Sequence, residues 1–169
     1  MSDIIILAGS SHKNLELAKD FAKRMDAKKQ QAKVIDLTEL NLPLYTTKEE
    51  KKGIPEAVAD YVSQFSAAKG FIFAVPEYNG GVPPVVSNTI AWISRGADDW
   101  RGCFNGKPAI ISSYSGGGGN HVLMALRIQL SLLGMNVFGR QIIVNSKQQL
   151  NSEHMDATID LLIASLVHH

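Results

Sequence analysis

The sequence is poor in the features that mark several classes of protein. Its single cysteine, Cys103, excludes an internal disulfide framework and any zinc or iron–sulfur site built from cysteines of this chain alone. No apolar stretch approaches the roughly 18 residues that span a membrane, and the N-terminus carries no basic, apolar and cleavable leader pattern. We therefore expect a cytoplasmic protein that is neither exported nor inserted in a membrane.

The charge balance and the length narrow the choice further. The chain has 17 basic and 16 acidic side chains, so we expect neither a nucleic-acid-binding stripe nor a polybasic membrane surface. The histidines are not spaced with carboxylates as metal ligands are, which predicts no metal site. A chain of 169 residues, 45% of them apolar, buries one full core. We expect a single domain over residues 1–169 with a small molecule as its partner.

Short apolar runs rich in β-branched residues alternate with amphipathic stretches, a pattern typical of an α/β fold with a parallel sheet and helices on both faces. We expect strands at residues 4–8, 33–37, 70–75, 108–112 and 137–144. Helices are expected from a cap at Asn14, from Pro55 in a first turn, over 83–94, over 120–133, and from a cap at Asn151 or Ser152. Residues 38–53 are expected to form a long loop with a solvated Lys and Glu run.

The loops after the first, third and fourth strands are the candidate site, because ligands of open parallel sheets bind outside the carboxyl ends of the strands. The first loop is small and polar and leads into a helix start, where backbone N–H groups and the helix dipole attract a phosphate. Its candidates are Gly9, Ser10, Ser11, His12 and Asn14. Such residues also make ordinary capped turns. The loop lacks G-x-G-x-x-G and the Walker lysine pattern, which disfavours a classical dinucleotide fold or an NTPase.

The other two loops are richer in special residues than a connection requires. Residues 76–83 combine an aromatic ring with glycines that let the backbone approach a flat ligand. Residues 112–119 offer hydroxyls and backbone N–H groups to a heterocycle, although four glycines also describe a flexible surface turn. The candidates are Pro76, Glu77, Tyr78, Asn79 and Gly80 in the former loop and Ser113, Ser115, Gly116 and Gly117 in the latter.

A few conspicuous side chains have an ordinary explanation. Cys103, Trp92 and Trp100 are expected to pack in the interior, as these residue types usually do. His121 follows the glycine run, so it either approaches a bound ligand or faces solvent at a helix start. The sequence identifies no catalytic residue.

These loops resemble those of the NADPH-dependent FMN reductase family, flavodoxin-like proteins that include quinone, azo-dye and chromate reductases. Pro76-Glu77-Tyr78-Asn79 is similar to the family's P-E-Y-N loop, and Asn88, Trp92 and Ser94 are similar to its N-x-x-x-W-x-S segment. The glycine run that leads to Leu126-Arg127 is similar to the family's glycine-rich loop and L-R helix. The resemblance covers nearly the whole chain.

The resemblance implies a flavodoxin-like three-layer sandwich whose five-stranded parallel sheet has the order 2-1-3-4-5. It implies that the first loop binds the phosphate of FMN and that the other two loops hold its ring. NADPH or NADH would reduce the FMN, and a small acceptor such as a quinone or free flavin would then take the hydride. Two positions depart from the family pattern: the first loop is shorter than G-S-x-R-x-x-S-x-N, with His12 near the arginine, and Ser87 replaces a frequent lysine.

The resemblance also implies a homodimer or a tetramer that pairs through the helix at residues 84–95. The apolar stripe of that helix would serve equally well to pack it on its own sheet; the stripe consists of Val85, Val86, Ile90 and Ile93. Arg95 and Arg101 are candidates for contacts with NADPH phosphates, or else for ordinary salt bridges.

Two other functions remain open at this point. A flavodoxin-type electron carrier would also hold FMN, but such carriers are expected to have a strongly one-signed surface, and the net charge here is +1. A flavodoxin-like binding or regulatory protein that has lost reductase activity is the other alternative, because a fold does not fix a function.

Overall fold

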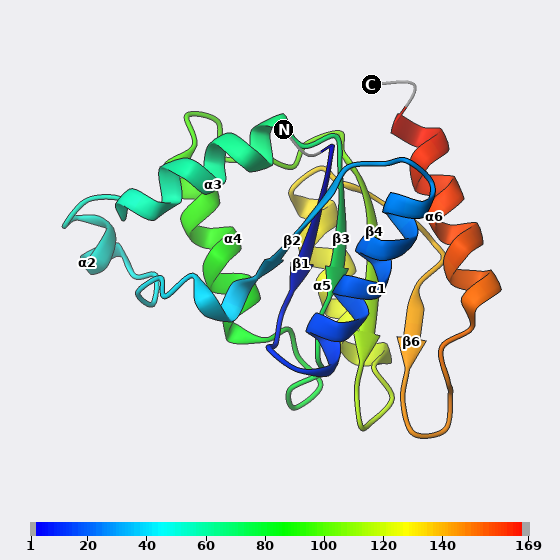
Figure 1. The fold of residues 1–169 in the computed structure, drawn as a ribbon. Helices are drawn as coiled ribbons and strands as arrows, with labels where there is room; N and C mark the ends of the chain where they lie inside the picture. The colour runs from blue at the N-terminus through cyan, green and yellow to red at the C-terminus, as the bar shows by residue number, and fades with distance from the viewer. Residues whose placement is uncertain (1–2, 167–169) are drawn as a thin grey trace.

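The computed structural model describes residues 3–166, which form a parallel sheet between two layers of helices (Figure 1). The strands are β1 (Ile4–Ala8), β2 (Ala32–Asp36), β3 (Gly70–Ala74), β4 (Pro108–Tyr114), β5 (Asn136–Val137) and β6 (Ile142–Val144). The helices are α1 (Lys13–Ala27), the 3-10 turn η1 (Leu37–Glu39), α2 (Thr47–Glu50), α3 (Glu56–Ala67), α4 (Pro84–Gly96), α5 (Asn120–Leu132) and α6 (Ser152–Leu166).

The sheet has the order β2-β1-β3-β4-β5, with β6 also paired to β4, and every pair is parallel. The predicted flavodoxin-like α/β fold and its order 2-1-3-4-5 are confirmed. Parallel strands need helical crossovers, and these cover both faces of the sheet. Helices α1 and α6 pack on one face and α3, α4 and α5 on the other, so each face has its own core (Figure 1). The central strands β1 and β3 are therefore buried along their whole length.

The last strand differs from the prediction of one strand over residues 137–144. It is divided into β5, which pairs with Pro108 and Ala109, and β6, which pairs with the far end of β4. Between them the chain leaves the ladder, because the guanidinium of Arg127 donates to the carbonyls of Val137 and Phe138 at 3.2 and 2.7 Å. A side chain from α5 thus binds two carbonyls at the point where β5 ends.

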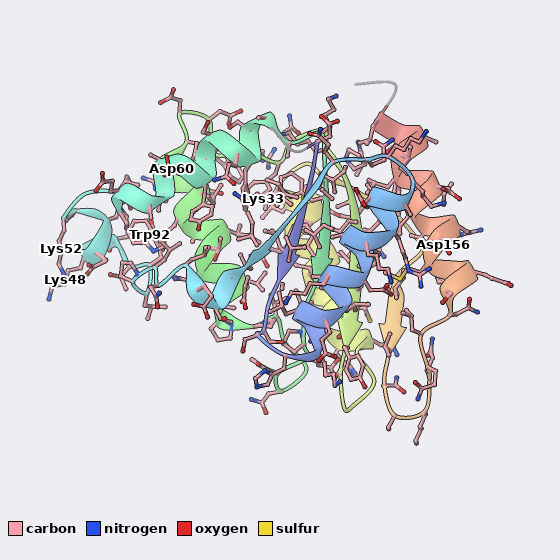
Figure 2. All side chains as sticks on the ribbon, in the orientation of Figure 1. Lys33, Lys48, Lys52, Asp60, Trp92 and Asp156 are labelled. Carbon is pink, nitrogen blue, oxygen red and sulfur yellow. The ribbon has the colours of Figure 1, made fainter. Side chains whose placement is uncertain are left out.

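The segment between β2 and α3 is also more ordered than the predicted loop. It contains η1 and the one-turn helix α2, which Thr46 caps by accepting from the Glu49 amide at 3.0 Å. Lys48 and Lys52 point outward from its tip, as expected of a solvated charge run (Figure 2). Glu50 does not belong to that run, because it accepts a hydrogen bond from the Tyr45 hydroxyl at 2.8 Å. We call residues 40–55 the excursion.

Helix α4 anchors the excursion. The indole Nε1 of Trp92 donates to the Pro43 carbonyl at 2.7 Å, and Asn88 Oδ1 accepts from the Tyr45 amide at 2.7 Å. Asn88 Nδ2 also donates to Pro43 at 3.0 Å. The rings of Tyr45 and Trp92 meet edge to face with their centroids 5.2 Å apart. Trp92 is fully buried between α4 and the excursion (Figure 2).

The other boundaries lie close to the predicted ones. Asn151 caps α6 by accepting from the His154 amide at 2.9 Å, as expected. Pro55 precedes α3 instead of lying in its first turn. Across residues 3–166, no helix combines the length and apolar character needed to cross a bilayer. The single domain and the cytoplasmic location stay predictions.

Candidate functional site

Strands β1, β3 and β4 lie side by side in register, so the loops that follow them meet at one edge of the sheet, the lower edge in Figure 1. We call these the first loop (residues 9–14), the second loop (residues 76–83) and the third loop (residues 115–119). Every site residue predicted from the sequence, except Ser113 at the end of β4, lies in one of them. The structure therefore brings the predicted residues to a common edge.

The first loop begins with a close approach to its neighbours. The Gly9 amide donates to the Ala74 carbonyl at 2.9 Å, and a Cβ on Gly9 would lie 3.0 Å from Val86 Cγ2. Ser11 and His12 are exposed, and Ser10 is partly exposed. Helix α1 follows with no side chain capping its first turn in the described chain. Its free amides and dipole form a site for an anion such as a phosphate.

Asn14 does not cap α1, contrary to the sequence prediction. It lies inside the helix, 2% exposed, and accepts from the Tyr114 amide at 2.8 Å while donating to the Tyr114 carbonyl at 3.0 Å. The partner is 100 residues away in sequence, which is why local pattern did not reveal it. The side-chain amide of Asn14 thus holds the start of α1 against the end of β4. The exposed polar groups of the first loop are those of residues 10–12.

The second loop is a tight hairpin. Tyr78 and Gly81 exchange backbone hydrogen bonds of 3.3 and 2.9 Å, and the two residues between them, Asn79 and Gly80, have φ values of 51° and 75°. Two left-handed residues in this place define the turn for which an Asn-Gly pair is preferred. The hairpin holds the side chains of Tyr78 and Asn79 exposed at the sheet edge, whereas Pro76 is buried.

Glu77 joins the second loop to the third. Its side chain is 12% exposed, and the carboxylate accepts from the Val122 amide in the first turn of α5 at 3.2 Å. A carboxylate at a helix N-terminus is stabilised by the helix dipole. His121 lies beside it with Nδ1 3.8 Å from the carboxylate, and the His121 side chain is 77% exposed. His121 therefore faces solvent at the rim of the site, and its approach to a ligand stays a prediction.

The third loop offers hydroxyls and open glycine backbone. The Ser113 hydroxyl is buried beside Gly119 without a hydrogen-bond partner among residues 3–166. Ser115 accepts from the Gly117 amide at 3.3 Å, and nothing lies within 4 Å of a Cβ built on Gly116. Residues 116–118 also line a cavity of about 440 Å³ together with residues 145–148. This last segment was not predicted from the sequence, because it lacks glycine and aromatic residues.

These features fit an FMN molecule. The uncapped start of α1 suits its phosphate, and the exposed hairpin and open glycine backbone suit a flat ring. The buried Ser113 hydroxyl is an unsatisfied group of the kind that a bound ligand or water completes. Over the described residues, His, Cys, Asp and Glu do not gather in groups of three that could hold a metal ion.

The two candidate arginines lie outside this edge. Arg95 pairs with Glu50 at 2.6 Å, and this contact raises the pKa of Arg95 above its ordinary value. Arg101 stacks on the ring of Trp100, with 4.4 Å from its guanidinium carbon to the ring centroid. The prediction of a buried Trp100 is wrong, since it is 46% exposed, whereas Cys103 and Trp92 are buried as expected. Arg95 thus follows the salt-bridge alternative.

The parallel order, the two helical layers and a ligand edge formed by the loops after β1, β3 and β4 define a flavodoxin-like protein. The sequence profile described as NADPH-dependent FMN reductase matches residues 2–149. The chain belongs to this family, and it is an oxidoreductase that uses FMN with NAD(P)H as reductant.

The chain is also similar to individual proteins in sequence and in fold. An uncharacterised Mycoplasma pneumoniae protein, named as an MG342 homologue, is 30% identical over 140 residues, which cover 80% of this chain and 82% of that protein. The Escherichia coli quinone reductase is 31% identical over 109 residues, 64% of this chain but only 54% of the enzyme. The solved structure of FerB, a flavoenzyme NAD(P)H:(acceptor) oxidoreductase from Paracoccus denitrificans, superposes with a TM-score of 0.80 at 19% identity and covers 100% of this chain and 99% of that one.

Proposed function

We propose that this chain transfers a hydride from NAD(P)H through bound FMN to a small acceptor such as a quinone or free flavin. The observation that carries the proposal is that the uncapped start of α1 and the exposed Asn79-Gly80 hairpin meet at one edge of the sheet. The family supports the reductase over an electron carrier or a flavin-free module. The name of the E. coli relative supports a quinone as acceptor.

The chain's own residues would bind and orient, since FMN supplies the hydride chemistry when it is bound. Backbone amides and polar side chains of the first loop hold the phosphate, and the second and third loops hold the ring. The phosphate residues are Gly9, Ser10, Ser11 and His12, and the ring residues are Pro76, Tyr78, Asn79, Gly80, Ser113, Ser115, Gly116 and Gly117. Asn14 and Glu77 act through these loops, because their side chains join neighbouring elements.

The test is an FMN titration of the purified protein by fluorescence quenching, followed by NAD(P)H oxidation with a quinone. Ser10→Ala removes a hydroxyl of the phosphate loop. Asn79→Gly removes the amide at the ring while keeping a residue that accepts a φ of 51°. Each change is expected to weaken FMN binding about tenfold, the loss of one ligand hydrogen bond.

Asn41→Gly is the matched control, because Asn41 is also exposed with a positive φ of 48° and lies in the excursion. It is expected to leave FMN affinity unchanged. Saturable quenching with turnover, weakened in both site variants alone, agrees with the proposal. Absence of quenching at high micromolar FMN would contradict it and point to a flavin-free module.

We further propose a homodimer that pairs through α5 and not through α4. On α4, Val86, Ile90 and Ile93 are at most 6% exposed and face the sheet of their own chain. On α5, Met124, Ile128 and Leu132 are 63%, 72% and 64% exposed. Their spacing of four residues places them in one stripe, and the helix carries no acidic side chain to repel a second copy.

Ile128→Lys tests the α5 pairing, since a charge in the middle of an apolar interface is costly to bury. It is expected to turn the dimer into a monomer in light scattering at micromolar protein. Leu44→Lys is the matched control, because Leu44 is also 72% exposed but lies in the excursion. A dimer that survives Ile128→Lys would contradict the α5 interface.

A further inference from the structure

His121 stands between the two loops that would hold the ring. It lies in the first turn of α5, directly after the third loop, and its Cβ is 3.8 Å from the place that a Cβ on Gly80 of the second loop would occupy. Its side chain is 77% exposed. An acceptor that enters this edge from solvent therefore meets His121 at the rim.

The carboxylate of Glu77 lies beside this histidine. The carboxylate is fixed from one side by the Val122 amide at 3.2 Å and is only 12% exposed. The imidazole Nδ1 lies 3.8 Å from the same carboxylate oxygen. Since Nδ1 is turned to Glu77, Nε2 on the opposite side of the ring is left for a second partner. A carboxylate that orients a histidine in this way is a recurrent arrangement in general acid–base chemistry.

We propose that His121, oriented by Glu77, donates the proton that the acceptor requires on reduction. This rests on the proposed function. A hydride brings two electrons and one hydrogen to a quinone, so one further proton is needed for the neutral hydroquinone. The Nε2–H bond of the imidazolium breaks, the new O–H bond forms on the quinone oxygen, and the imidazole regains a proton from water. NAD(P)H is the electron source.

Two electron acceptors distinguish proton donation by His121 from a general effect on electron transfer. A quinone needs hydride and proton, whereas ferricyanide takes electrons alone. In the FMN-loaded protein, His121→Gln is expected to slow 1,4-naphthoquinone reduction about 100-fold, the lower end of what a positioned acid contributes. Ferricyanide reduction should change less than about twofold. Glu77→Gln keeps an oxygen that can accept from the Val122 amide. It should also lower the ratio of the quinone rate to the ferricyanide rate.

A binding measurement gives a readout that does not depend on turnover. The probe is 2-hydroxy-1,4-naphthoquinone, whose ionised oxygen accepts a hydrogen bond from a protonated imidazole. At pH 6 its dissociation constant from the FMN-loaded protein should rise about tenfold in His121→Gln, the loss of one ligand hydrogen bond. The affinity of 1,4-naphthoquinone, which lacks that oxygen, should not change.

Two control variants change a histidine outside the site and a second exposed proton donor inside it. His154→Gln changes a histidine whose Nε2 already contacts the Gln141 carbonyl at 3.2 Å, and it should alter neither rate. Tyr78→Phe removes the exposed hydroxyl of the second loop and should leave the ratio of the quinone rate to the ferricyanide rate unchanged. Equal losses for both acceptors in His121→Gln, no loss, or a ratio that falls in Tyr78→Phe instead would overturn the proposal. A wild type that reduces neither acceptor would overturn the proposed function and this role with it.

Discussion

The second loop and helix α4 follow one another within a single sequence motif, but their polar side chains have opposite environments. In the loop, Tyr78 and Asn79 are exposed, and Asn79 lies at the tip of a hairpin. In α4, Asn88 and Trp92 are bonded to the backbone of the excursion at 2.7 Å each. The loop presents its polar groups to the sheet edge, whereas the helix uses them inside the molecule.

This difference shows that a motif that identifies a family contains scaffold residues as well as ligand residues. Both halves are equally recognisable in the sequence, and only the contacts separate them. Changes in α4 should therefore lower the free energy of unfolding, and changes in the hairpin should lower ligand affinity. Variants in the two halves of the motif test that division.

The largest effect is expected for Trp92→Ala. The side chain is fully buried, its ring centroid lies 5.2 Å from that of Tyr45, and its indole donates to the Pro43 carbonyl, so its loss leaves a cavity and removes one of the two side-chain donors to that carbonyl. We expect the free energy of unfolding in urea to fall by about 3–5 kcal/mol. The FMN affinity of the folded fraction should not change. Trp100→Ala, at a site 46% exposed, is the control and should cost less than about 1 kcal/mol.

A smaller loss is expected for Asn88→Ala. The change leaves the Tyr45 amide without its side-chain acceptor and removes one of the two side-chain donors to the Pro43 carbonyl, at a cost of about 1–3 kcal/mol in urea unfolding. Because the excursion loses one of its anchors on α4, trypsin should also cut faster at Lys48. Ser87→Ala, one position earlier, is the control. Unchanged proteolysis with weakened FMN binding would instead assign Asn88 to the site.

Asn79 provides the opposite half of the comparison, with an effect of about 1 kcal/mol on stability. Its φ of 51° disfavours alanine, so the free energy of unfolding of Asn79→Ala, measured in urea, should be about 1 kcal/mol lower than that of Asn79→Gly. Both variants lack the amide and should bind FMN equally weakly. If Asn79→Gly were itself several kcal/mol less stable than wild type, the side chain would belong to the scaffold and the comparison would fail.

Most of the fold could be predicted because it depends on patterns within short segments. The apolar runs at β1, β3 and β4 and the turn residues around them indicated the strands and the sheet edge at which their loops meet. The strand order came from the resemblance to the family. The same reasoning located the three loops of the site. Asn79-Gly80 is a turn signal that can be recognised in any sequence.

Three of the differences from the prediction share one cause, which is a hydrogen-bond partner outside the segment itself. Arg127 divides the last strand by bonding two of its carbonyls, and Asn14 bonds Tyr114 across 100 residues instead of capping its own helix. The excursion became ordered because α4 offers donors and acceptors to it. Neither propensity nor periodicity within a segment contains this information.

The smallest expected effect is the pH dependence of the stability that Glu50 gives to the excursion. The hydrogen bond from the Tyr45 hydroxyl, and then the one from Arg95, hold the pKa of Glu50 below its ordinary value of 4.5. The folded protein thus binds fewer protons at Glu50 than the unfolded chain does, so this stabilisation is present above pH 4.5 and is lost as the pH falls through the lowered pKa. Wild type should exceed Glu50→Gln in urea midpoint at pH 7, and the gap should narrow as the pH falls below 4.5. A gap that does not change with pH would mean that Glu50 supports the excursion through packing and not through its charge.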